Sequence, residues 1–358
     1  MMEPDTYQQL SLFPTATACF PSTRYQGSKA KLTDWIWEQI ADLDFHTCLD
    51  AFAGTGAVAY RLKQEGKSIT YNDLLRFNYH IGQAIIENDQ VQLDFEDVQW
   101  LLQKHSEIVY PIFVQDTFHN IYFTDEENAW IDQTMTNIRR LAHPYKFALA
   151  FFALCQACMI KRPYNLFHRK NLYMRFADVE RSFGNKRSWD RPFPEWFQTF
   201  IEEANQAVFD NGQSNQALNH DALEVVGDYD LVYVDTPYIS RKGVAVDYLA
   251  FYHFLEGLTI YDEWEKKLDH HSKHLRLQLR PNEWTDKRQI HAAFNRLFHR
   301  FRKSILVVSY RSDGIPIESE LVSLLQKYKR HVRVEHYGHY KYALSTNSNS
   351  KELLLIGV

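Results

Sequence analysis

The sequence predicts a mixed α/β fold with a mostly parallel sheet, interrupted by a mainly helical insertion. Within residues 46–72, an apolar strand is followed by a glycine turn, a helix and a second strand. This order is typical of a βαβ unit, whose strands are parallel. The alternation stops over residues 91–215, where helical patterns dominate, and resumes at Leu231. The two flanking parts are therefore expected to belong to one α/β domain.

The first part, residues 21–90, is expected to bind a nucleotide-sized ligand at the ends of its strands. Residues 1–20 show no sustained periodicity and are expected to form a loosely ordered lead-in. The elements predicted next are a helix over 30–41, a buried strand over 46–52, a helix over 57–64 that Gly66 can terminate, and a strand over 68–72.

The insertion is expected to be a separate helical domain over residues 91–215. Its predicted helices cover 125–141, 145–160 and 193–209, and they surround an irregular, basic and aromatic stretch over 161–189. The last part, residues 216–358, returns to strands at 231–234 and 304–310. Two closing strands, 332–337 and 353–358, could pair antiparallel.

Composition indicates a globular protein that can bury a full core. The chain has 358 residues, of which 45% are hydrophobic and 15% aromatic. The longest apolar stretch, residues 147–160, is shorter than the roughly 20 residues that cross a bilayer, so no membrane association is expected. The four cysteines are expected to be free thiols in a reducing compartment. We therefore expect a cytoplasmic protein, associated with the nucleoid if it acts on DNA.

The formal net charge of −5 hides an uneven distribution. Residues 161–191 carry +6 and residues 266–303 carry +8, so the rest of the chain is strongly acidic. Two basic segments can face phosphate groups while the acidic remainder keeps the protein soluble. Each segment alone could equally be a solvated helix face.

The turn Gly54-Thr55-Gly56 indicates a site where a ligand approaches the start of a helix closely. Asp73 follows the next strand and would suit a ribose hydroxyl. These features fit a nicotinamide dinucleotide as well as S-adenosylmethionine, so a dehydrogenase stays an alternative at this point.

The tetrapeptide Asp235-Thr236-Pro237-Tyr238 follows a later strand and suits an exocyclic amine on a flat base. The Asp235 carboxylate and the Thr236 carbonyl could accept both amine protons and direct the nitrogen lone pair toward a methyl donor. Tyr238 would stack on the base. Because a paired base cannot reach such a pocket, the target base would have to flip out of the duplex.

Taken together, these motifs resemble those of the adenine-specific DNA methyltransferases of the Dam-like, alpha-ordered group. The resemblance covers residues 24–80 and 219–256. It includes Arg24-Tyr25-Gln26-Gly27-Ser28-Lys29, Asp50 to Gly56, Asn72-Asp73 and Asp235 to Tyr238. Thr236 departs from the family, which usually has proline there.

The resemblance implies an S-adenosylmethionine-dependent methyltransferase with a Rossmann-like fold, acting on the 6-amino group of adenine in double-stranded DNA. The cofactor would be held by Tyr25, Lys29, Asp50, Gly54, Gly56, Asp73 and Asp221, and the catalytic residues would be Asp235, Thr236, Pro237 and Tyr238. The inserted domain would recognise the target sequence. A companion restriction endonuclease is a possible partner.

DNA recognition is expected from the basic and aromatic stretch of the insertion. Arginine and lysine suit phosphates and guanine, and asparagine suits adenine edges. The expected DNA-binding residues are Lys161, Arg162, Asn165, His168, Arg169 and Lys170.

Several alternatives stay open at this point. The same chemistry could act on RNA or on a protein glutamine, or the chain could be a homologue that binds DNA without turnover, with Thr236 as its marker. No metal is expected. Cys155 and Cys158 have metal-ligand spacing but lie in an apolar helical run without a second cysteine pair.

Overall fold

The computed structural model describes residues 18–178, 186–338 and 350–358. Its centre is a seven-stranded sheet in the order β3-β2-β1-β4-β5-β7-β6. The strands are β1 (Thr47–Asp50), β2 (Ser68–Asn72), β3 (Gln216–Leu218), β4 (Leu231–Val234), β5 (Ile305–Arg311), β6 (Val332–Tyr337) and β7 (Glu352–Gly357).

The first five strands are parallel and the last two form an antiparallel edge. β1 pairs with β2 and β4, β2 with β3, and β4 with β5, all parallel. β7 pairs antiparallel with both β5 and β6. The predicted mixed α/β fold with a mainly parallel sheet is confirmed, and so is the pairing of the two closing strands.

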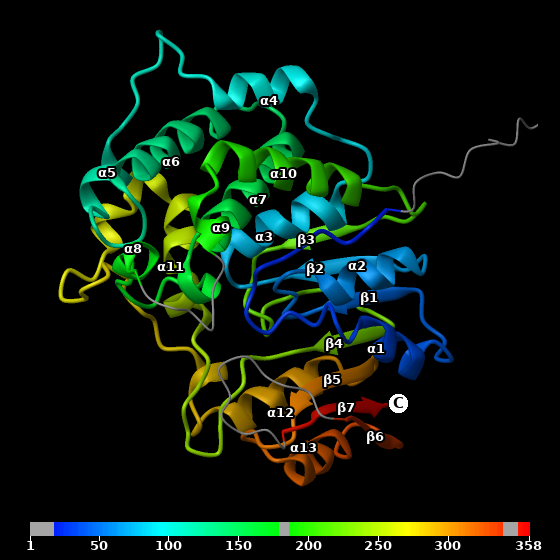
Figure 1. Cartoon of the computed structure of the whole chain (residues 1–358). Coiled ribbons are helices and arrows are strands. Elements are labelled where there is room, and N and C mark those ends of the chain that lie inside the picture. The colour runs from blue at the N-terminus through cyan, green and yellow to red at the C-terminus, as the bar shows by residue number, and fades with distance from the viewer. Residues whose placement is uncertain (1–17, 179–185, 339–349) are drawn as a thin grey trace, which may run out of the picture.

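The α-helices of the described residues lie around this sheet. They are α1 (Thr33–Ile40), α2 (Ala57–Gln64), α3 (Arg76–Gly82), α4 (Phe95–Leu102), α5 (Phe113–Thr117), α6 (Asp125–Ile138), α7 (Pro144–Ile160), α8 (Tyr173–Phe176), α9 (Lys186–Asp190), α10 (Phe193–Ala207), α11 (Tyr248–Thr259), α12 (Ile290–Arg300) and α13 (Glu318–Leu325). Figure 1 shows α4 to α10 beside the β3 edge and α12 and α13 near the β6 edge.

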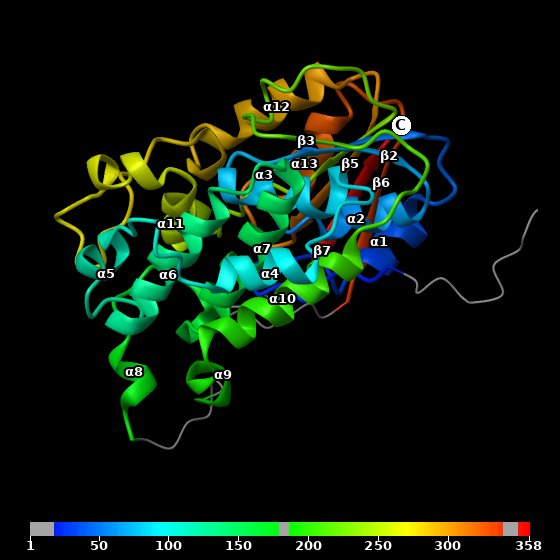
Figure 2. The ribbon, with the colours of Figure 1, turned by 90° about the horizontal axis from the view of Figure 1, so that it is seen from above.

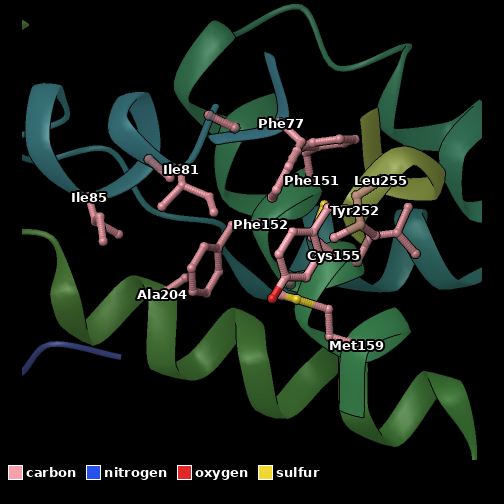
Figure 3. Close-up of a cluster of buried hydrophobic side chains, with 14 of the residues drawn as sticks. Phe77, Ile81, Ile85, Phe151, Phe152, Cys155, Met159, Ala204, Tyr252 and Leu255 are labelled. Carbon is pink, nitrogen blue, oxygen red and sulfur yellow. The ribbon is translucent and has the colours of Figure 1, made fainter. Parts of the chain in front are cut away.

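Helix α7 is the centre of the helical part. All its residues from Ala148 to Ile160 are buried, including Cys155 and Cys158, which are free thiols. α7 packs against α10, α3 and the π-helical turn Gln83–Glu87 that continues α3. Figure 3 shows side chains of α3, α7, α10 and α11 meeting in this cluster. The expectation that the cysteines are free thiols is confirmed.

The helical part and one side of the sheet share a continuous core. This cluster runs from Cys48 and Ile69 on the sheet, through α7, to Phe254 and Trp264. Phe254 lies on α11, which follows the tetrapeptide in sequence, and it packs edge-on against Phe118 of the insertion at 5.1 Å between ring centroids. Two distant stretches of the chain therefore build the helical part together. The boundaries 91 and 215 stay a prediction.

Candidate functional site

Three aspartates lie at the carboxyl ends of three neighbouring parallel strands. Asp50 ends β1, Asp73 follows β2 and Asp235 follows β4. β1 lies between β2 and β4, where the chain direction of the connections reverses, and open α/β sheets bind ligands at such a point. A cavity of about 870 Å³ opens there. Of the predicted site residues it is lined by Tyr25, Lys29, Asp50, Gly54, Asp73, Asp221, Asp235 and Pro237.

The glycine turn shapes one wall of the cavity. Gly54 and Gly56 have φ values of +55° and +75°, a backbone conformation that favours glycine. The Gly54 N–H donates to Asp73 Oδ2 at 2.9 Å. Gly56 is the residue before α2 and does not line the cavity, so its contribution is the turn itself.

Hydrogen bonds from the side chains of Asn72 and Asn219 connect the strand ends. The Asn72 side-chain amide donates to Ala51 O at 3.0 Å and to His220 O at 3.1 Å. The Asn219 amide in turn donates to Asp73 O at 2.8 Å. Asp221, two residues further on, is thereby placed at the cavity.

Tyr25 is held in a stack of aromatic rings. Its ring lies 4.5 Å from that of Tyr252 and 5.3 Å from that of Tyr248, at interplanar angles of 12° and 13°. Gly27 permits the close approach of Tyr248, because a Cβ atom at Gly27 would lie 2.5 Å from the Tyr248 hydroxyl oxygen. The N-terminal motif is thus fixed by α11, which approaches the cavity from the helical part.

Lys29 joins the cluster around Asp235. Its ammonium group donates to both oxygens of Asp235 at 2.8 Å and also to the hydroxyl of Tyr238. Glu352, at the start of β7, lies 3.3 Å from Lys29 Nζ. Lys29 is 5% exposed and Glu352 is fully buried, whereas Asp235 keeps 16% exposure toward the cavity.

The carboxyl groups of Asp50, Asp73 and Asp235 gather at the strand ends that line the cavity. Burial, together with the nearby charges of Asp235 and Asp73, raises the pKa of Asp50 well above its ordinary value. Burial also raises the pKa of Asp73. Asp50 Oδ1 is buried and has no hydrogen-bond partner among the described residues. A cationic ligand in the cavity would relieve this clustering of like charges.

The tetrapeptide is only partly open to the cavity. Asp235 and Pro237 line it, whereas Thr236 and Tyr238 are 3% and 6% exposed and do not. The Tyr238 ring lies edge-on against Tyr310, with 5.2 Å between ring centroids. In this structure Tyr238 is not placed to stack on a base in the cavity, because its hydroxyl turns inward to hydrogen-bond acceptors.

The prediction that Lys161 and Arg162 contact DNA is wrong, because both side chains are buried. Lys161 is 2% exposed and pairs with Glu127 at 2.8 Å. Arg162 is 1% exposed, and its guanidinium group donates to the backbone oxygens of Leu166, Tyr122 and Arg169. These cations hold the stretch in shape from inside.

The rest of the predicted DNA-binding residues lie nearer the surface. Arg169 and Lys170 are exposed, and Asn165 and His168 are partly buried. Burial lowers the pKa of His168 to about 4, so this side chain is neutral at pH 7. Tyr164, adjacent to Asn165, is 49% exposed. Figure 2 shows that α8 and α9, which follow this stretch, project from the body of the molecule.

Three groups of cavity or cluster residues are absent from the sequence prediction. They are the α11 residues Tyr248 and Glu256, the segment from Leu277 to Trp284, and the buried Glu352. Glu352 carried a weak signal, since it directly precedes the apolar run Leu353 to Ile356. The segment 277–284 has no regular pattern that could have identified it.

A comparison with protein families matches the model of the D12 class N6 adenine-specific DNA methyltransferases over residues 25–313. This range contains the N-terminal motif from Tyr25 onward, the glycine turn and the tetrapeptide. The chain belongs to this family. It is therefore an adenine-specific DNA methyltransferase. The predicted methyltransferase fold and the family resemblance are confirmed.

The curated relatives that the chain matches are type II methyltransferases and modification methylases. The type II methyltransferase M2.HphI of Haemophilus parahaemolyticus is 29% identical, over 94% of this chain and 97% of the relative. The type II methyltransferase M.CviAII of Paramecium bursaria Chlorella virus 1 is 25% identical, over 93% of this chain and 97% of the relative. M.FokI of Planomicrobium okeanokoites is 27% identical over 89% of this chain but 48% of its own length.

Two features are absent from the described residues. None of their helices is long and apolar enough to cross a membrane. No group of three or more histidine, cysteine or acidic side chains is arranged to hold a metal ion in the same part of the chain.

Proposed function

We propose that this methyltransferase transfers a methyl group from S-adenosylmethionine to the 6-amino group of a flipped adenine in a specific sequence of duplex DNA. The observation that carries the proposal is a single cavity that extends from the glycine turn to Asp235. Donor and acceptor can thus meet at the strand ends without crossing a barrier of protein.

The residues around the cavity fit S-adenosylmethionine, which supplies an electrophilic methyl group on a positively charged sulfur when bound. Asp50 offers a buried oxygen without a partner among the described residues, and a positive ligand would be favoured beside it. Asp73 accepts from the amides of Gly54 and Leu75 at 2.9 and 2.8 Å, which holds its carboxylate ready for ribose hydroxyls.

Asp235 is the proposed acceptor for the target amine. Among the side chains of the tetrapeptide, the Asp235 carboxylate is charged and also reaches the cavity. As the amine nitrogen takes the methyl group it becomes positive, and a fixed negative charge beside it stabilises that change. The Thr236 carbonyl is the proposed second acceptor, and Tyr238 anchors the Asp235 carboxylate through a hydrogen bond of 2.8 Å.

The test is transfer of labelled methyl from S-adenosylmethionine to unmethylated duplex DNA of varied sequence, with digestion to nucleosides. We expect label in 6-methyladenine with the wild type and at least about a hundredfold less with Asp235→Asn, which keeps the shape but removes the charge. Asp228→Asn makes the same change at an exposed site and should act like the wild type. Label in RNA or protein, with none in DNA, would contradict the proposal.

For DNA contacts we propose Asn165, Arg169 and Lys170, with Tyr164 beside them. Arg169 and Lys170 suit phosphate groups, and each neutralised phosphate adds to the salt dependence of binding. Replacing both with glutamine should weaken DNA binding and reduce the slope of log K against log salt by about 2. Equal slopes for the variant and the wild type would remove this loop from the DNA interface.

A further inference from the structure

The cluster around Asp235 contains a second carboxylate that the family motifs do not assign. Glu352 opens strand β7 and is fully buried. The Ser309 hydroxyl of the neighbouring strand β5 donates to Glu352 Oε1 at 2.5 Å. β5 and β7 are paired so that Ser309 lies opposite Leu354, two residues after Glu352. The side chains of Ser309 and Glu352 therefore lie on the same face of the sheet. A buried carboxylate costs stability unless its contacts offset the lost hydration, so its position calls for a functional reason.

Two donors stand between Asp235 and Glu352. Lys29 Nζ lies 2.8 Å from both Asp235 oxygens and 3.3 Å from Glu352 Oε1. The Tyr238 hydroxyl lies 2.8 Å from Asp235 Oδ1 and 3.2 Å from Glu352 Oε1. The single hydroxyl proton of Tyr238 can serve either carboxylate, and the ammonium group can shift toward either one.

This arrangement matters because Asp235 is already engaged. Its carboxylate accepts from Lys29 and Tyr238, so a target amine has to compete with these donors for the same oxygens. A second acceptor that shares the hydrogen bonds of Lys29 and Tyr238 weakens their hold on Asp235. The Asp235 oxygens then keep more negative charge and can accept from the target amine. Glu352 is such an acceptor, and it lies on the side of the cluster away from the cavity, since it does not line the cavity.

We propose that Glu352 is a positioning residue that draws Lys29 and Tyr238 away from Asp235 and so keeps Asp235 a strong acceptor for positive charge at the transfer position. The inference rests on the proposed function. In the reaction the amine nitrogen forms the new N–C bond, the C–S bond breaks with its pair remaining on sulfur, and the surplus amine proton leaves by way of Asp235 to water. Glu352 touches none of these atoms and acts through Lys29 and Tyr238.

The first test does not depend on turnover. Sinefungin carries an ammonium group where the cofactor carries its methyl group, and S-adenosylhomocysteine has no charge there, so the ratio of their dissociation constants reports the potential beside Asp235. We expect Glu352→Gln to lose about tenfold in affinity for sinefungin while binding S-adenosylhomocysteine like the wild type. The control Glu335→Gln, on the neighbouring strand β6 and partly exposed, should leave both constants unchanged.

The second test is single-turnover methylation of DNA. Glu352→Gln should lower the rate of methyl transfer at saturating cofactor about tenfold to a hundredfold, because the substitution weakens a charge that matters when the amine becomes positive. In steady-state assays KM for S-adenosylmethionine, whose sulfur is positive, should rise, while KM for DNA should change little. If Glu352→Gln does not fold, Ser309→Ala decides. It removes only the hydroxyl that donates to Glu352, so the carboxylate draws more on Lys29 and Tyr238, and both readouts should shift in the opposite direction by a smaller factor.

The outcomes separate the two proposals. An unchanged ratio of sinefungin to S-adenosylhomocysteine affinity in a folded Glu352→Gln protein overturns the role of Glu352, whether or not the wild type methylates DNA. A changed ratio supports that role even if the methylated substrate proves to be different. A wild type that binds neither analogue contradicts the proposed cofactor and, with it, this inference.

Discussion

At the scale of single residues, Thr236 shows why the departure from the family's proline need not abolish activity. Its hydroxyl is buried and has no hydrogen-bond partner among the described residues. The side chain therefore makes no polar contribution in this part of the chain, and the proposed function uses only the backbone carbonyl. Asp235 and Tyr238 make the hydrogen bonds of the tetrapeptide with Lys29.

Thr236→Val tests this interpretation, because valine has the same shape without the hydroxyl. Removing a buried, unpaired hydroxyl should raise the free energy of unfolding by up to about 1 kcal/mol and leave kcat within about twofold of the wild type. Denaturant unfolding and methyl transfer measure the two effects. A large loss of kcat in a stable variant would instead assign a chemical role to the hydroxyl.

At the scale of elements, the stretch from residue 161 to 171 contains buried cations that stabilise the loop and exposed cations that do not. Arg162 donates to backbone oxygens and to Asn171 from inside the loop, whereas Arg169 points its charge outward. The basic composition of the stretch thus has two different causes. Half of its charge holds the loop and the other half is available to a partner.

Substitution of the two arginines by methionine should separate these roles. Arg162→Met leaves several buried carbonyl groups without their donor and should lower the free energy of unfolding by about 3–5 kcal/mol. Arg169→Met should change stability by no more than about 0.5 kcal/mol, as expected at an exposed site. Denaturant titration of both variants makes the comparison. Equal stability losses would contradict the assignment.

Glu256 connects two elements at the edge of the cavity. Its carboxylate on α11 accepts from the amides of Arg76 and Phe77 at the start of α3, at 3.2 Å each. Burial raises the pKa of Glu256 to about 7, despite these hydrogen bonds. The carboxyl group thus links the helix that carries Tyr248 and Tyr252 to the loop that carries Asp73.

This link predicts a pH dependence of stability. An unfolded glutamate ionises near pH ~4.3, so between that pH and about 7 the folded protein holds a proton that the unfolded chain has lost. The free energy of unfolding must then fall as the pH rises through this window. Glu256→Gln cannot titrate, so the wild type should lose about 1–3 kcal/mol more than this variant between pH 4.5 and 7.5. Parallel pH profiles from denaturant unfolding would contradict the prediction.

At the scale of the whole molecule, the continuous core argues for one cooperative unit. The apolar cluster joins Ile69 of the sheet to Leu149 of α7 and to Trp264 beyond α11. Because every residue of α7 from Ala148 to Ile160 is buried, neither the sheet nor the helical part can keep its apolar surface covered alone.

The expected result is a single unfolding transition. Far-ultraviolet and near-ultraviolet circular dichroism should give the same denaturant midpoint, and a chain in which residues 91–215 are replaced by a short linker should not yield soluble folded protein. A soluble, cofactor-binding product of that deletion, or two separate transitions, would show that the insertion is an independent domain.

Local patterns in the sequence determined much of this protein. The βαβ unit, the helix over α7 and the closing strands each follow from periodicity and turn residues that lie within one segment. The same holds for the motif residues Asp50, Asp73 and Asp235, because each lies at the end of an apolar strand and the ends of neighbouring parallel strands meet at one edge. The family resemblance then supplied the chemistry.

Only the tertiary structure decided which charges are inside and which distant groups meet. Lys161 and Arg169 belong to the same basic stretch, yet one is buried against Glu127 and the other is exposed. Glu352 reaches Lys29 from the opposite end of the chain. Burial and contacts between distant residues depend on how elements pack, and a pattern of neighbouring residues holds no information about partners more than 300 positions away.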